Sequence, residues 1–221
     1  TTGAANVAIG QGSLGTNTTA SNNIAVGKNT LGLNTTGASN VAVGASALDA
    51  NTTASNNVGI GLNAAGGTTT GGNNVAIGTN SLLTNTTGAS NVSIGTYTLN
   101  ANTTASNNTA VGYATLITNT TGSENTGLGH NALYGTTTGT GNTGIGQGAL
   151  QTNTTGGTNT AVGQGSLALN TTASNNVAVG KNTLAANTTG SNNTALGIQA
   201  LDGNTTGSEN VGIGSNALGS N

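Results

Sequence analysis

The stretch Asn40–Asn56 reads N-V-A-V-G-A-S-A-L-D-A-N-T-T-A-S-N, and its pattern recurs along the whole chain. Val41, Ala42 and Val43 alternate as a short strand does, which places the two valines on one face. Gly44 ends this strand. A glycine at every strand end indicates a corner with positive φ, which glycine adopts without steric cost.

A second apolar segment and a polar return complete the turn. Ala47 and Leu48 form the apolar segment, which we expect to be a second short strand. The return, residues 51–56, is rich in side chains that hydrogen-bond to nearby backbone. Since 17 residues are too few for a helical crossover, each turn is expected to contain strand, glycine corner, short strand and return.

The corner recurs every 17 residues without an insertion, so thirteen turns account for all 221 residues. A fixed period of this length is typical of quasi-one-dimensional stacked folds. We therefore expect an all-β fold, a parallel β-solenoid formed by residues 1–221 as a single repeat array. The predicted structural corners are Gly10, Gly27, Gly44, Gly61, Gly78, Gly95, Gly112, Gly129, Gly146, Gly163, Gly180, Gly197 and Gly214.

Three apolar positions per turn, those of Val41, Val43 and Leu48, are expected to be buried. Their burial falls short of the conformational entropy that ordering a turn costs, and ladder hydrogen bonds close much of this gap. Further burial between chains is therefore favoured over the alternative, a solenoid that stands alone. The position between the two valines holds only Ala, Gly or Ser, which suggests that another backbone comes close. We expect this flat file, which includes Ala8, Ala25, Ala42 and Gly59, to be the contact face.

One asparagine file runs from Asn6 to Asn210 with a residue in every turn. An amide ladder, in which each side chain bonds to its copy in the turns above and below, accounts for such a file. Ligand recognition is the alternative interpretation. A binding site has no need of thirteen copies, so the ladder is favoured.

Asn-Thr-Thr triplets are candidate glycosylation sites, and the alternative is that they simply build a turn. Thr68 and Thr136 replace the asparagine in two turns, which would interrupt an N-linked file but not a threonine-linked one. Asn91, Asn107 and Asn192 also head acceptor triplets. The candidate sites are Asn17, Asn34, Asn51, Asn85, Asn102, Asn119, Asn153, Asn170, Asn187 and Asn204.

Two unbroken threonine files, which begin at Thr1 and Thr2, also raise the possibility of an ice-binding surface. Adjacent residues of a strand point to opposite faces. Each face would then carry one threonine file rather than a matched pair, which weakens the ice-binding interpretation.

The composition excludes several classes of function. Charged residues make up 3% of the chain, cysteine is absent and the formal net charge is -2. Lys28 and Lys181 cannot form a nucleic-acid surface, and no apolar run is long enough for a membrane span. With one histidine and four carboxylates, no metal set or catalytic triad is expected. We expect neither enzymatic activity nor a cofactor.

A few side chains stand out from the repeat. His130, Tyr97, Tyr113 and Tyr134 occupy neighbouring turns and would form a patch for stacking on a sugar; surface residues at variable positions are the alternative. Among the charged residues, Glu124 and Glu209 share one position of the turn, Asp49 and Asp202 another, and Lys28 and Lys181 a third.

The string N-V-A-I-G-x-x-S-L at Asn6–Leu14 resembles the head repeats of YadA-like trimeric autotransporter adhesins. The string N-T-A-V-G-Y-x-x-L-x-x-N-T-T-G at Asn108–Gly122 resembles arrays in phage and bacterial tail-fibre proteins. The resemblance implies a left-handed parallel β-roll, trimeric in the adhesins, that acts as a stalk or head outside the cell. The turn here is longer than the adhesin repeat, and parallel crossovers generally prefer the right hand.

Taken together, these features predict a structural protein of an extracellular, cell-surface or virion fibril, with a glycan coat as a further feature. The chain starts and stops inside a repeat, which suggests a window of a longer fibre that self-associates as a trimer or an end-to-end polymer. One alternative is an adhesin or receptor-binding head, with specificity in the variable positions. An ice-binding solenoid is the other.

Overall fold

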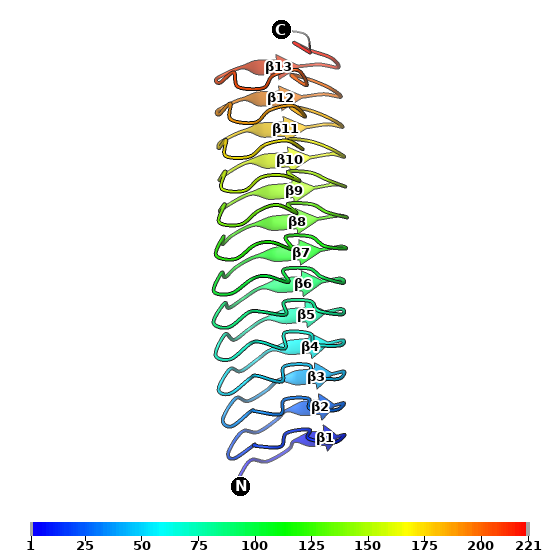
Figure 1. Ribbon diagram of the computed structural model, residues 1–221, viewed down its shortest axis with the longest axis vertical. Coiled ribbons are helices and arrows are strands. Elements are labelled where there is room, and N and C mark those ends of the chain that lie inside the picture. Colours follow the sequence, from blue (N-terminus) through cyan, green and yellow to red (C-terminus); the bar gives the residue numbers. More distant parts are fainter. Residues whose placement is uncertain (1, 220–221) are drawn as a thin grey trace. The chain divides into compact units, whose positions relative to one another are not determined.

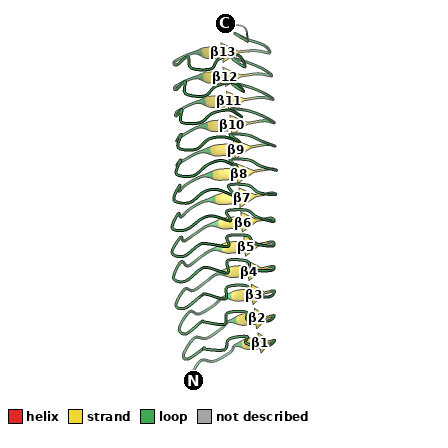
Figure 2. Cartoon of the chain, in the orientation of Figure 1, coloured by secondary structure: helices red, strands yellow, loops and turns green. Residues whose placement is uncertain are grey.

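The computed structural model describes residues 2–219, and these residues form an all-β parallel solenoid. Short strands alternate with loops and turns throughout the described part of the chain (Figure 2). The strands are β1 (Val7–Ile9), β2 (Ile24–Val26), β3 (Val41–Val43), β4 (Val58–Ile60), β5 (Val75–Ile77), β6 (Val92–Ile94), β7 (Thr109–Val111), β8 (Thr126–Leu128), β9 (Thr143–Ile145), β10 (Thr160–Val162), β11 (Val177–Val179), β12 (Thr194–Leu196) and β13 (Val211–Ile213).

The chain divides into two compact units, Thr1–Asn108 and Thr109–Asn221. The first contains β1–β6 and the second β7–β13, and within each unit successive strands pair in chain order (Figure 1). Every described pair is parallel and in the register of the repeat, so that Val41 pairs with Val58 and Thr126 with Thr143. The predicted fold class and the 17-residue turn are therefore confirmed.

The second apolar segment of each turn is a turn rather than the predicted short strand. Leu48 has a φ of 51° and its equivalents along the chain also have positive φ, a conformation that a strand cannot contain. The segment nevertheless stacks on its neighbour, because the Leu48 N–H donates to the carbonyl of Ala64 at 3.0 Å. Stacking between turns thus extends well beyond the three-residue strands.

The two faces of the strand are the reverse of those predicted. Ala42 is fully buried, whereas the flanking Val41 and Val43 point outward and are half-buried and 37% exposed respectively. The interior next to the strand is already occupied. A Cβ added to Gly59, the equivalent of Ala42 in the next turn, would lie 3.0 Å from Cγ of Leu48.

This narrow interior explains why only Ala, Gly or Ser occupies the middle of the strand. The close approach predicted from these small residues is real, but it comes from the same chain. The file of Ala8, Ala25, Ala42 and Gly59 faces inward beyond the first turn and cannot be the contact face between chains. The outward side of the strands, which we call the strand face, is aliphatic or threonine in every turn.

The return follows a three-residue period instead of the two-residue period of a strand. Asn51, Ala54 and Asn57 are buried, each is followed by a half-buried residue, and the third residue, such as Thr53, is exposed. One leucine, small alanines or glycines and two asparagines therefore fill the interior of a typical turn. Hydrophobic burial per turn is modest, so the hydrogen bonds of the asparagines must supply part of the stability of the interior.

The glycine corner has the conformation predicted for it. Gly44 has a φ of 126°, a region open to glycine alone. The corners also stack on one another. A Cβ added to Gly44 would lie 2.5 Å from the carbonyl oxygen of Gly61 in the next turn, so both conformation and packing require glycine.

Candidate functional site

The asparagine file from Asn6 to Asn210, which we call the inner asparagine file, is the predicted amide ladder and lies inside the coil. Oδ1 of Asn23 accepts hydrogen bonds from the backbone N–H of Asn40 at 2.9 Å and from its Nδ2 at 3.2 Å. The same Nδ2 donates to the carbonyl of Ala54 at 2.9 Å, across the coil. Each side chain thereby ties one turn to the previous turn and also closes its own turn, which is a structural role.

The candidate glycosylation positions form a second ladder within the interior. Asn51 Nδ2 donates to Asn34 Oδ1 at 2.8 Å and to the carbonyl of Ala54 at 3.1 Å. Asn17 and Asn204 are half-buried, and the other eight candidates are fully buried. The nitrogen to which an N-linked sugar would be attached is consumed by hydrogen bonds inside the coil, so burial argues against modification there.

The additional acceptor triplets differ in exposure. Asn91 is fully buried as a member of the inner file, whereas Asn107 and Asn192 are exposed and have φ values of 62° and 61°. Their exposure comes from the tight bend that precedes the inner asparagine. These two are the triplet heads whose side chains reach the surface.

The two threonines of each Asn-Thr-Thr return have different environments. Thr35 is half-buried, and its Oγ1 donates to the carbonyl of Thr52 in the next turn at 3.0 Å. Thr36, the second threonine, is exposed. Its equivalents form what we call the exposed threonine file: in the first unit Thr19, Thr36, Thr53, Thr70, Thr87 and Thr104, and in the second Thr121, Thr138, Thr155, Thr172, Thr189 and Thr206.

The predicted aromatic patch is realised as one pair. The rings of Tyr113 and His130 lie parallel within 11°, with their centroids 5.5 Å apart. Both follow a glycine corner in successive turns of the second unit. Tyr134 is exposed at a different position of its turn, and Tyr97 is exposed in the first unit.

The remaining charged groups are scattered along the coil. Asp49 leans over Gly32 of the preceding turn, where an added Cβ would lie 2.6 Å from its Oδ1. Partial burial raises the pKa of Asp49 above its ordinary value of 3.8. Within residues 2–219, no three His, Cys, Asp or Glu side chains gather as metal ligands would.

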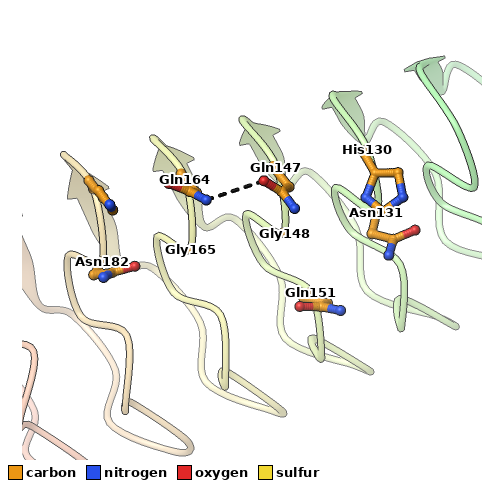
Figure 3. Close-up of a pocket in the computed structure, with 9 residues that line it drawn as sticks. His130, Asn131, Gln147, Gly148, Gln151, Gln164, Gly165 and Asn182 are labelled. Atoms are coloured by element: carbon orange, nitrogen blue, oxygen red, sulfur yellow. Dashed lines mark hydrogen bonds between the residues drawn. The ribbon is translucent and has the colours of Figure 1, made fainter.

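A shallow groove of about 310 Å³ lies on the second unit, next to the turns that follow β8 to β11 (Figure 3). It exists because Gly148 and Gly165 occupy the position that Asn131 and Asn182 fill in the flanking turns. The φ of Gly148 is 63° and that of Asn131 is 56°, so the backbone is the same and only the side chain is missing. Sequence reasoning missed this groove, although two glycines in a file that holds asparagine on either side were its signal.

Five of the nine residues that line the groove carry a side-chain amide. Gln164 Nε2 donates to Gln147 Oε1 at 3.2 Å, which aligns the two amides along one wall (Figure 3). The lining residues are His130, Asn131, Gln147, Gly148, Gln151, Gln164, Gly165, Lys181 and Asn182.

Comparisons with models of protein families, with curated proteins and with solved structures found no match. The described residues also contain no helix that could cross a bilayer.

Proposed function

We propose that this chain is a structural subunit of an extracellular or virion-surface fibre. The observation that carries the proposal is the continuity of the interior within each unit, where most turns repeat the same inward residues and the same bonds between turns. Two asparagine ladders and the glycine corner shape each turn and stack it on its neighbours. A sequence that devotes its interior to stacking and leaves a repetitive surface suits a structural element better than a catalyst.

The strand face is the surface that we expect to bring copies together. It presents two outward side chains per turn, and Ile9, Ile24, Val43 and Ile60 are among those at least 37% exposed. Exposed, contiguous aliphatic surface in a nearly uncharged chain favours association. This face replaces the Ala/Gly/Ser file, which is buried, while trimer and end-to-end polymer remain alternative arrangements.

Electron microscopy of the purified chain, combined with light scattering, tests this proposal. Regular filaments, or a discrete oligomer whose mass does not change on dilution, would support a structural assembly. A monomer at all concentrations, together with an absence of filaments in native material, would refute it.

A glycan coat is a second element of the proposal, and the exposed threonine file supports it. Thr53 is exposed in a turn where Asn51 is buried, so the hydroxyl is accessible while the amide is not. Mass spectrometry of native material should find sugar on the second threonine of each triplet and none on the asparagine. Bare threonines in native filaments would remove the coat from the proposal.

Two alternatives from the sequence retain specific support. The groove on the second unit favours the adhesin interpretation, because it is the kind of hollow that a small ligand needs. Ice binding has weaker support, since the first threonine of each triplet uses its hydroxyl within the coil and leaves one exposed file. Thermal hysteresis of a dilute solution would distinguish ice binding from both other functions.

A further inference from the structure

We propose that the groove on the second unit binds a short neutral oligosaccharide. This inference goes beyond the fibre, because the groove lies within one unit of a single chain and requires no second copy.

The shape of the groove favours a short chain molecule. Asn131 and Asn182 bound it along the coil and stand three turns apart, which is about 14 Å at the usual spacing of parallel strands. Gly148, which is buried, and Gly165, which is half-buried, line its floor without a side chain. The hollow is therefore elongated along the coil, as a di- or trisaccharide would require.

The chemistry of the lining favours hydroxyl groups. Each amide side chain offers a donor and an acceptor, which matches sugar hydroxyls because these also donate and accept. The bond from Gln164 to Gln147 holds one wall in place and leaves further donor and acceptor capacity on both amides. Lys181 is the one charged residue among the lining residues, and it is exposed, so water and salt weaken its attraction for an anion.

An aromatic platform closes one end. Figure 3 shows the imidazole of His130 at the end of the groove, beside Asn131. Tyr113 lies parallel to this ring on the side of the preceding turn and restrains it. A flat ring next to amides suits a sugar, which has an apolar C–H face and a polar rim of hydroxyls.

His130 also makes the binding directly measurable, because it is the only histidine of the chain. Its two ring C–H protons give isolated NMR signals in the full-length protein. We would titrate three neutral trisaccharides, namely cellotriose, maltotriose and triacetylchitotriose, and one acidic probe, trigalacturonate. Binding of at least one neutral probe with a Kd on the order of 1 mM or tighter should shift the His130 signals.

The matched variants use the geometry of the floor. Gly148→Asn fills the groove and should fold, because Asn131 has nearly the same φ and the Cβ would meet only the flexible end of Gln151, 3.2 Å away. Gly12→Asn makes the same change at the equivalent position of the first unit, outside the groove. Thermal unfolding confirms that both variants are folded before titration.

The expected result is a saturable shift in the wild type and in Gly12→Asn that is lost in Gly148→Asn. Three outcomes would overturn the proposal: no shift with any neutral probe, an undiminished shift in folded Gly148→Asn, or a shift with trigalacturonate alone that added salt abolishes. The last outcome would mean that Lys181 attracts an anion without a sugar site. Filament formation is measured separately, by microscopy. A lack of sugar binding would therefore leave the fibre proposal intact, and a lack of filaments would leave the sugar-binding proposal intact.

Discussion

The side-chain oxygen of Asn51 is buried without a hydrogen-bond partner, because Thr68 occupies the place where the next turn would present an asparagine. One turn earlier the ladder is closed by a bond of 2.8 Å from Asn51 Nδ2 to Asn34 Oδ1. The hydroxyl of Thr68 instead accepts a long bond of 3.4 Å from Asn85. The ladder is thus interrupted at one rung, where an acceptor inside the coil is left unsatisfied.

Thr68→Asn should therefore stabilise the protein. The new amide would donate to Asn51 and restore the rung, which gains about 1 kcal/mol and removes the penalty of a buried orphan acceptor. Chemical denaturation followed by circular dichroism measures the change. Thr53→Asn, at an exposed position of the preceding turn, is the control and should have little effect. An unchanged or lower stability in Thr68→Asn would show that the side-chain ladder does not stabilise the coil.

Gly44→Ala should destabilise the coil by about 2 kcal/mol or more, because alanine disfavours a φ of 126° and its Cβ would collide with the carbonyl of Gly61. Gly66→Ala is the matched control. Its φ is not positive, and alanine occurs naturally at the same position of the turn in Ala168 and Ala185. Equal unfolding midpoints for the two variants would contradict the account of the corner.

Lysines at Val43 and Ile60 should abolish self-association without unfolding the chain. Both side chains are 37% exposed on the strand face, so in the isolated chain the charges reach water, whereas in an assembly they would be desolvated and unpaired. Light scattering gives the mass. The control places lysines at Thr53 and Thr70, which are exposed on the return in adjacent turns. If both double variants assemble equally well, the strand face is not the interface.

The free energy of unfolding should depend slightly on pH in the acid range because of Asp49. Partial burial raises its pKa in the folded state above 3.8, so the protonated form is the one that folding favours. Stability is therefore highest below the unfolded pKa and falls as pH rises through the raised folded pKa. The comparison of wild type with Asp49→Asn isolates this pH dependence, because the variant has no carboxyl group at position 49 to titrate. Parallel pH profiles for the two proteins would contradict it.

The parts of the fold that could be read from the sequence are those where one residue type is compulsory. Gly44 predicts the corner because no other residue tolerates its backbone conformation. Asn40 predicts a ladder because an amide side chain can hydrogen-bond to the same side chain in the next turn. The period alone then gives the register of every described strand pair.

Other features could not be read from residue preferences. Leu48 adopts a left-handed conformation that leucine disfavours by about 1–2 kcal/mol, and only its tertiary fit inside the coil explains it. The strand faces were predicted in the wrong sense because hydrophobicity suggested that Val41 and Val43 lie inside. Steric space decided otherwise, since a coil this narrow admits Ala42 but not a second large side chain next to Leu48.

The groove could not be predicted from the sequence for a different reason. Glycine at Gly148 and Gly165 has two meanings, a backbone requirement or a missing side chain. The φ values of Gly165 and Asn182, 66° and 53°, lie in the same left-handed region, so the difference between these two turns here is the missing side chain. A repeat pattern gives the residues that all turns share, whereas the groove arises at positions where neighbouring turns differ.

The uniform 17-residue offset between bonded turns has a consequence for heredity. Because most turns meet their neighbours through the same inward residues at the same offset, the loss or gain of a whole turn would preserve the register of the remaining turns. Unequal recombination between the segments that encode whole turns would delete or duplicate these turns in frame. The length of the product would then change in steps of one turn, while the remaining turns keep their hydrogen-bond register.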